Sequence, residues 1–257
     1  MKRWILVLAA AWGCLAACDR GEALRTEVFE CRESHALTEG SADSISVRIR
    51  IEYPVSGAPE EVLERIRATV AERTVGSGRL EEAARSYVDA ALADYRENAG
   101  DLLRWAAEEG AGHGVLDWEQ QVSGYVYAHY GNLLSYGIQV YSYQGGAHGL
   151  SGDEALLFDL ADGRLVPEEE LFVPGFRDEM AGLLTAHLRE AMPDEDSYEA
   201  LFAKDIEPNG NFRVSEKGIT YIYNPYSIGP YYLGGIEVTV PWEEAEPLLA
   251  DRSPGSD

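Results

Sequence analysis

The sequence predicts an α+β fold with antiparallel sheets, packed helices and two closely associated subdomains. Three observations support this prediction. The 257 residues are 46% hydrophobic, which is enough to bury a sizeable core. Segments with a two-residue apolar repeat occur in pairs, whereas segments with a helical repeat occur in blocks. The regular alternation of strands and helices that is typical of a parallel α/β sheet is missing.

The first half of the chain is predicted to contain strands followed by two helices. Residues 44–53 alternate strictly between apolar and polar side chains and form the clearest strand in the sequence. Pro54 should end this strand. A helix should begin at Pro59, and a longer helix should begin near Leu80 and break at residues 98–100.

The second half is predicted to contain a hairpin, a helix and several short strands. The hairpin covers residues 118–143, and a strand over 155–160 is followed by a third strand segment around Leu165. The remaining elements are a helix over about 175–191, strands over 212–214, 219–223 and 236–240, and a short helix that starts at Pro241. Acidic runs at Glu168–Glu170 and Glu243–Glu244 should be solvated helix starts, where carboxylates favour the helix dipole.

These elements suggest five segments along the chain. They are a lipoprotein signal peptide over residues 1–17, a tether and first strand over 18–40, a smaller subdomain over 41–115, a larger one over 116–250, and a flexible tail over 251–257.

The N-terminus has the features of a secretory signal. Lys2 and Arg3 precede an apolar run that is too short to span a bilayer. Residues 15–18, Leu-Ala-Ala-Cys, resemble the bacterial lipobox, in which the cysteine receives a diacylglyceryl group and becomes the mature N-terminus. We therefore expect Cys18 to be lipidated and to hold the protein on the extracytoplasmic side of a bacterial membrane, on the periplasmic face if the cell is Gram-negative. The alternative is a plain signal peptide that leaves Cys18 as a free thiol.

Composition excludes several classes of function. With 45 acidic and 21 basic residues, the formal charge of −24 repels a phosphate backbone, so nucleic acid is not expected as a partner. The five histidines show no metal-ligand spacing, and we expect neither a metal ion nor a cofactor. No G-x-S-x-G elbow is present. Cys31 should be a small buried residue, with a reactive or intermolecular thiol as the alternative.

One candidate ligand-binding group is the run Gly145-Gly146-Ala147-His148-Gly149. The glycines permit positive φ and can either expose or bury the imidazole. His148 could contact a ligand or act as a base. It could also donate a ring N–H to a carbonyl and hold the loop in place. Gly145, Gly146 and His148 are therefore candidate binding residues, and no catalytic residue is predicted.

A second candidate is the stretch from Tyr221 to Gly235, which contains five tyrosines, two prolines and three glycines. Such a composition predicts a shaped loop. Tyrosine rings offer a large contact area and a hydroxyl group, which suits recognition of sugars or of a protein surface. They suit packing against the protein's own sheet equally well. Tyr226 and Tyr231 are the candidate ligand-binding residues of this loop.

A family resemblance links these runs. The order of motifs resembles the extracytoplasmic domain of RsiV-type anti-sigma factors, which also precedes the catalytic part of PdaC-type peptidoglycan deacetylases, and residues 44–110 look like the smaller domain that accompanies it. The motifs are Gln144-Gly-Gly-Ala-His148, Phe158-Asp159-Leu160 with Gly163, Leu171-Phe172, Tyr223-Asn-Pro-Tyr226-Ser-Ile-Gly-Pro-Tyr231 with Gly234, and Val240-Pro241-Trp242.

The resemblance implies an α+β envelope domain, which in the anti-sigma proteins binds lysozyme. No sigma-binding segment, spanning helix or deacetylase domain is recognised in this sequence, so neither sigma release nor deacetylation is carried over. We expect a non-enzymatic, lipid-anchored binding module for peptidoglycan or an envelope protein. The alternatives are a protein that binds a basic, lysozyme-like partner and a glycan-directed hydrolase that uses His148 or a carboxylate pair.

Overall fold

The computed structural model describes residues 23–39, 42–109 and 116–250, so the predicted signal peptide, Cys18 and the predicted tail lie outside the described residues. The chain divides into two compact units. Unit 1 comprises Met1–Tyr125 and Gln139–Ser151, and unit 2 comprises Val126–Ile138 and Gly152–Asp257. Strands β3, β4 and β5 contribute residues to both units, so the units are not separated at a single point of the chain.

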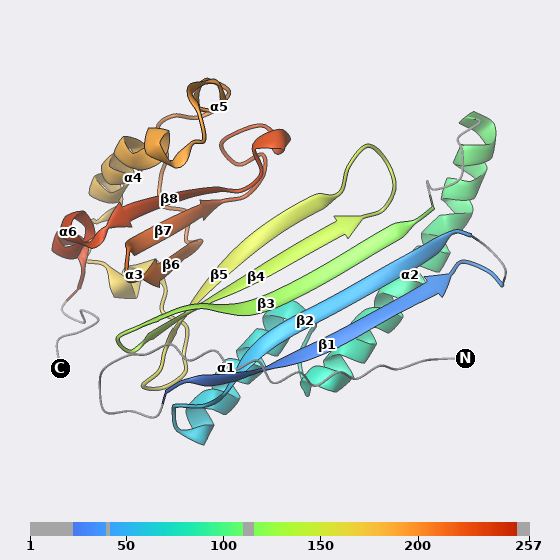
Figure 1. The fold of residues 1–257 in the computed structure, drawn as a ribbon, viewed down its shortest axis with the longest axis horizontal. Helices are drawn as coiled ribbons and strands as arrows, with labels where there is room; N and C mark the ends of the chain where they lie inside the picture. The colour runs from blue at the N-terminus through green and yellow to red at the C-terminus, as the bar shows by residue number, and fades with distance from the viewer. Residues whose placement is uncertain (1–22, 40–41, 110–115, 251–257) are drawn as a thin grey trace. The chain divides into compact units, whose positions relative to one another are not determined.

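The described residues confirm the predicted α+β class (Figure 1). Their strands form one sheet in the order β1-β2-β3-β4-β5 and a second in the order β6-β7-β8. The strands are β1 (Arg25–Ala36), β2 (Ser44–Ser56), β3 (Trp118–Tyr130), β4 (Leu133–Tyr143), β5 (Leu150–Asp159), β6 (Phe212–Ser215), β7 (Gly218–Tyr223) and β8 (Ile236–Pro241). The α-helices are α1 (Glu60–Thr74), α2 (Leu80–Glu109), α3 (Glu168–Leu171), α4 (Arg177–Ala191), α5 (Glu195–Glu199) and α6 (Trp242–Ala245), and the 3-10 helices are η1 (Tyr231–Leu233) and η2 (Glu246–Leu248).

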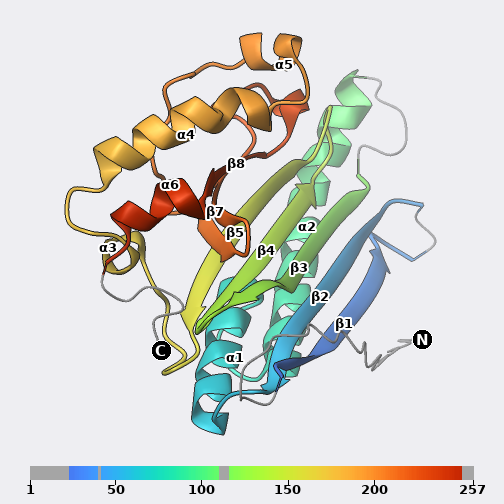
Figure 2. The ribbon, with the colours of Figure 1, turned by 60° about the vertical axis from the view of Figure 1, so that its left-hand side comes forward.

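In unit 1, helices α1 and α2 cover one face of the β1–β2 pair (Figure 2). The alternation in β2 creates this face, because every second side chain points to the same side of a strand. Cys31 lies opposite Ile49 on β2, and it is buried as predicted. Burial is also the main reason why the pKa of its thiol is raised above the ordinary value. The buried apolar side chains of β2 are Ile45, Val47, Ile49 and Ile51.

Three features of unit 1 differ from the sequence prediction. Strand β2 continues past Pro54 to Ser56, because Pro54 pairs with Thr26 beside a register shift between Arg25 and Thr26, and proline is tolerated at such irregularities. Helix α2 is also unbroken at residues 98–100. Ala99 is buried there and Asn98 donates from Nδ2 to the Asp94 carbonyl oxygen at 2.9 Å, which helps the helix to tolerate one glycine.

The third difference is the pairing of β2 with β3, which is parallel although antiparallel sheets were expected. Ile45 lies opposite Trp118, and Ile51 lies opposite Gly124. A parallel pair requires a long crossover connection. Helices α1 and α2 lie in the connection between these two strands. They carry the chain back to the end of the sheet at which β2 begins, so that β3 can run in the same direction as β2.

A buried tyrosine fastens α2 to the start of β3. The hydroxyl of Tyr95 donates to the Leu116 carbonyl oxygen at 2.8 Å, and its ring centroid lies 5.3 Å from that of Trp118. Burial, followed by the negative charges of Asp43 and Asp117, raises the pKa of Tyr95 to about 12. The neutral phenol is therefore the form that the folded protein stabilises.

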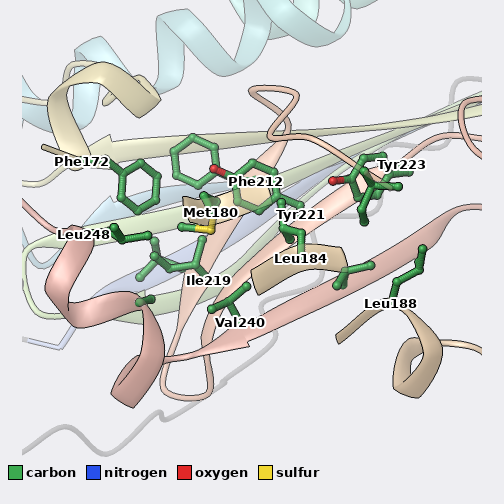
Figure 3. Close-up of a cluster of buried hydrophobic side chains, with 14 of the residues drawn as sticks. Phe172, Met180, Leu184, Leu188, Phe212, Ile219, Tyr221, Tyr223, Val240 and Leu248 are labelled. Atoms are coloured by element: carbon green, nitrogen blue, oxygen red, sulfur yellow. The ribbon is translucent and has the colours of Figure 1, made fainter. Parts of the chain in front are cut away.

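In unit 2, α4 packs on the three-stranded sheet and encloses a hydrophobic core (Figure 3). The predicted helix and three short strands are confirmed as α4, β6, β7 and β8. The rings of Phe172 and Phe176 stack with their centroids 4.6 Å apart, and the ring centroids of Phe212 and Tyr221 lie 5.6 Å apart. The labelled core side chains are Phe172, Met180, Leu184, Leu188, Phe212, Ile219, Tyr221, Tyr223, Val240 and Leu248.

Glu168 is not the solvated helix start that the sequence predicts. It is only 4% exposed. Its Oε2 accepts from Arg177 Nη1 at 2.9 Å, and its Oε1 accepts from the Gly210 backbone N–H at 3.1 Å. Arg177 also donates to the Pro208 carbonyl oxygen. The carboxylate and guanidinium together therefore fasten the loop around residues 208–210 to the helices.

The first prediction concerns alkaline pH. The ordinary pKa of tyrosine is about 10, so the contribution of Tyr95 to stability is complete below pH 10 and is lost as the pH rises to about 12. Tyr95→Phe should lower the unfolding free energy by about 1 kcal/mol at pH 7, because a buried hydrogen bond is lost. This deficit should shrink between pH 10 and 12 in urea unfolding followed by circular dichroism. A deficit that stays constant over this interval would contradict the assignment.

The second prediction concerns Glu168. Glu168→Ala should destabilise the protein by about 3 kcal/mol, because it leaves the partners of a buried carboxylate uncompensated. Glu169→Ala is the matched control, since Glu169 is the adjacent residue of α3 and is exposed; its effect should stay within about 0.5 kcal/mol. Equal effects of the two substitutions in urea unfolding would show that the buried carboxylate is not needed.

Candidate functional site

The Gly145–His148 group lies in unit 1, in the connection between β4 and β5. Gly145 and Gly146 have φ values of 89° and 94°, which a residue with a side chain rarely adopts. Tyr143 donates its hydroxyl to the Gly146 carbonyl oxygen at 3.0 Å. A Cβ atom on Gly149 would lie 2.5 Å from the Tyr141 ring, so any larger residue there would require this ring to move.

His148 is exposed, and its ring contacts the backbone of the next residue. Its Nδ1 lies 3.0 Å from the Gly149 carbonyl oxygen. Because a carbonyl oxygen only accepts, Nδ1 must carry the hydrogen in this contact. This is the kind of contact that the structural alternative for His148 predicts, but its partner is the next residue in the chain.

The tyrosine-rich loop, residues 224–235, lies in unit 2 between β7 and β8. Asn224 fixes its beginning to β5. The Asn224 Oδ1 accepts from the Asp153 backbone N–H at 2.6 Å, and its Nδ2 donates to the Asp153 carbonyl oxygen at 2.9 Å. Further along, the Ile228 carbonyl oxygen accepts from the backbone N–H of Phe202 at 2.8 Å. The loop is therefore held at two points by segments distant in the sequence.

Asn211 supports the same strand from the start of β6. Its Oδ1 accepts from the Ala155 backbone N–H at 2.7 Å, and its Nδ2 donates to the Asp153 carbonyl oxygen at 2.9 Å. An amide side chain offers one donor group and one acceptor, as a peptide group does. Asn211 and Asn224 thus occupy hydrogen-bonding positions that a neighbouring strand would otherwise fill.

Tyr226 adopts an unfavourable backbone conformation. Its φ is 71°, and within the described residues it is the one non-glycine residue with positive φ. The Ser227 backbone N–H donates to the Asn224 carbonyl oxygen at 2.9 Å, which closes a four-residue turn. Pro225 in the second position and positive φ in the third identify a type II turn, which normally has glycine in the third position. An L-residue there costs roughly 1–2 kcal/mol.

Two tyrosines of this loop are exposed to solvent, as is one residue that the sequence did not indicate. Tyr226 is 53% exposed, Tyr232 is 73% exposed and Phe202 is 65% exposed. The ring centroids of Tyr226 and Tyr231 lie 5.6 Å apart with a tilt of 32°. We call the side chains of Phe202, Tyr226, Tyr231 and Tyr232 the aromatic surface. Tyr226 and Tyr231 are in ring contact, Tyr232 follows in the same loop, and Phe202 is connected to the loop through its backbone.

Sequence reasoning found Tyr226 and Tyr231 but missed the contributions of Phe202 and Tyr232. Tyr232 belongs to the same tyrosine-rich stretch, so composition had already marked its neighbourhood. Phe202 gives no comparable signal, because it follows a short helix and is brought to the loop by the Ile228 hydrogen bond. An exposed phenylalanine cannot be distinguished from a core residue by composition alone.

Tyr221 and Tyr223 belong to the sheet below the loop and not to its surface. Both are buried, and Tyr223 donates its hydroxyl to the Glu207 carbonyl oxygen at 2.8 Å. Burial raises the pKa of both tyrosines well above the ordinary value, and the negative charge of Glu168 raises it further. These two residues therefore follow the packing alternative that the sequence left open.

The candidate groups that the sequence indicates are divided between the two units. Gly145, Gly146 and His148 belong to unit 1, whereas Tyr226 and Tyr231 belong to unit 2. Within the described parts of the chain, no cluster of His, Cys, Asp and Glu has the arrangement of a metal site. A search of the same residues finds no helix with the length and apolar character to cross a membrane.

A comparison of two substitutions should measure the backbone strain at Tyr226. Both remove the ring, but glycine adopts positive φ freely and alanine does not. Tyr226→Gly should therefore be more stable than Tyr226→Ala by about 1 kcal/mol, measured by urea unfolding. At a position with ordinary negative φ the order is reversed by a similar amount, so a more stable alanine variant would refute the strain.

Comparisons with known proteins agree with this architecture. Residues 169–243, which include the aromatic surface, match the family model "Protein of unknown function (DUF3298)". A member of the DUF3298 family from Bacteroides fragilis is similar to the chain with a TM-score of 0.78 and 23% identity, over 89% of this chain and 94% of that one. A DUF3298 family protein from Pseudomonas aeruginosa gives a TM-score of 0.57 and 18% identity, over 90% and 96%. None of the curated proteins matches the chain. The chain therefore has the fold of these two structures and carries a DUF3298 match in residues 169–243.

Proposed function

We propose that this protein is a non-enzymatic binding module of the bacterial cell envelope, held at the membrane by acyl chains on Cys18. Its ligand is peptidoglycan or an envelope protein. The observation that carries the proposal is the aromatic surface, in which a strained tyrosine is kept in solvent instead of being buried.

The backbone conformation of Tyr226 is energetically unfavourable. Positive φ at Tyr226 costs free energy, and the exposed ring recovers only a part of it through its contact with Tyr231. Strained residues that persist without a compensating gain in packing are concentrated at functional sites. Aromatic side chains in such positions are the groups that dominate recognition at binding surfaces. A recognition role for the loop accounts for both the conformation and the exposure.

The anchor is supported by the N-terminal sequence. The basic residues, the short apolar run and the Leu-Ala-Ala-Cys segment are typical of a lipoprotein signal. More than one acyl chain gives stable attachment, because each buried CH₂ group contributes about 0.8 kcal/mol. Attachment of this kind would keep the binding surface close to the cell wall.

A basic, lysozyme-like protein is the second candidate ligand. The formal charge of −24 favours it, because this charge would accelerate association with a cation. The resemblance to RsiV-type proteins points the same way. A complex of this kind should weaken strongly as salt is added, whereas binding to a neutral ligand should not.

Cell fractionation and sedimentation with sacculi test the proposal. The full-length wild type should enter the membrane fraction of a Gram-negative host, and Cys18→Ser should be released from it. The released protein should then sediment with purified sacculi at both 50 and 300 mM salt. An unrelated acidic protein is the control and should stay in the supernatant.

Other outcomes are equally decisive. A Cys18→Ser variant whose leader is cleaved and that still stays in the membrane fraction would refute the anchor. No sedimentation with sacculi, together with co-elution with lysozyme at 50 mM salt that is lost at 300 mM, would replace the peptidoglycan proposal by the second candidate. Altered muropeptide profiles after incubation with the protein would refute the non-enzymatic assignment.

A further inference from the structure

The tyrosine-rich loop, which holds three of the four residues of the aromatic surface, differs from the rest of the chain in charge. Residues 224–235 contain no Asp, Glu, Lys or Arg, although 26% of the chain is charged and its net charge is −24. The groups that this loop presents are aromatic faces, phenolic hydroxyls and backbone. A cationic partner would form no ion pair with this segment, because the segment has no carboxylate, and it would be left with the weaker attraction of the ring faces. The surface is complementary to a ligand that is itself uncharged.

We propose that the aromatic surface binds the pyranose rings of a neutral, N-acetylated glycan. This inference rests on the proposed function and makes it more specific, because it assigns recognition to the sugar backbone of the wall polymer and not to its peptides. Tyr226 and Tyr231 hold one sugar ring, and Tyr232 and Phe202 contact further sugar rings of the same glycan chain.

The chemistry of the two partners is complementary. One face of a β-linked pyranose ring presents C–H groups, while its edge presents hydroxyl and acetamido groups. An aromatic face carries partial negative charge and attracts such weakly positive hydrogens. The tyrosine hydroxyl can donate to or accept from the sugar's edge groups. Tyrosine therefore provides both contacts with few rotatable bonds, which keeps the entropy cost of binding small.

The backbone turn gives Tyr226 its special place in this surface. The type II turn is closed by the Asn224–Ser227 hydrogen bond, and Asn224 is fixed to Asp153. The ring is therefore carried by a supported turn and not by a free loop. Such preorganisation reduces the ordering cost on binding. A glycine in this position would keep the turn and remove only the ring.

The position of Phe202 follows from the fold and not from its own sequence neighbourhood. Its backbone N–H and that of Ala203 both donate to the Ile228 carbonyl oxygen, at 2.8 and 3.3 Å. The side chain of Leu201 packs nearby, 3.1 Å from the position of a Cβ atom on Gly229. Phe202 itself stays 65% exposed. The segment thus buries one apolar side chain and presents the next to solvent, while its backbone is hydrogen-bonded to the tyrosine-rich loop.

The test uses N,N′,N″,N‴-tetraacetylchitotetraose as a neutral, N-acetylated probe and the Cys18→Ser full-length protein. Binding is measured by calorimetry and by saturation-transfer NMR. A shallow exposed surface should bind it with a dissociation constant on the order of 1 mM or below. Saturation should transfer most strongly to the C–H protons of one ring face. The affinity should change by less than about twofold between 50 and 300 mM salt, because the probe has no charge.

Three variants locate the site. Tyr226→Gly and Tyr232→Ala should each weaken binding by about 3- to 10-fold, which is the range for the loss of one ring contact, while Tyr226→Gly should keep the circular dichroism spectrum of the wild type. Tyr127→Ala is the matched control, because Tyr127 is another exposed tyrosine of unit 2 but lies on β3 and stacks against Arg213. It should bind the probe as the parent protein does.

Failure of this inference can be distinguished from failure of the proposed function. If sacculi retain the protein but Tyr226→Gly and Tyr232→Ala sediment as fully as the parent, the wall is bound elsewhere and the aromatic surface is not the glycan site. If a deacetylated, cationic chitotetraose binds and the neutral probe does not, charge and not ring stacking drives the contact, which also overturns the inference. Loss of sacculus binding by the unsubstituted protein would instead refute the proposed function.

Discussion

The hydrogen bonds that Asn211 and Asn224 make to β5 are the interaction on which the arrangement of unit 2 depends. β5 is the last strand in its sheet order, and its outer edge is paired by a backbone segment only near its end, where Phe158 forms a bridge with Leu165. The two amide side chains satisfy the backbone at Asp153 and Ala155. Glu168 adds to this support, because it binds the backbone N–H of Gly210, the residue before Asn211. A buried carboxylate under the helices thus helps to position the residue that holds a strand.

The hydrogen bonds of Asn224 also support the aromatic surface. Asn224 is both a partner of β5 and the first residue of the type II turn that carries Tyr226. A strained residue can persist only where its surroundings fix the backbone. Here the anchor at Asn224 and the hydrogen bond to Ile228 provide that constraint. The energetic cost at Tyr226 and the stability of its supports are therefore parts of one arrangement, in which a rigid base carries an exposed ring.

Much of the fold was predictable because its elements have strong local patterns. The alternation in residues 44–53 and the apolar stripe of α4 each show which face is buried, since strand and helix periodicities differ. The predictions that were wrong have a common physical cause. Pro54, the Asn98–Gly100 segment and Glu168 were judged by their local propensities, but pairing with β1, the burial of Ala99 and the Arg177 ion pair overrode those propensities. Local preferences amount to about 1 kcal/mol or less per residue, and tertiary contacts exceed this.

The candidate site shows the same division. The sequence alone determined the strongly acidic balance, the lipoprotein-like N-terminus as an expectation, and the concentration of tyrosine, proline and glycine in residues 221–235. Only the tertiary structure decided that Tyr221 and Tyr223 are buried while Tyr226 and Tyr232 face solvent, that Phe202 joins them, and that the His148 ring contacts its own loop. The physical reason is that composition fixes which side chains are available, whereas exposure is set by residues distant in the sequence that cover one ring and leave another in water.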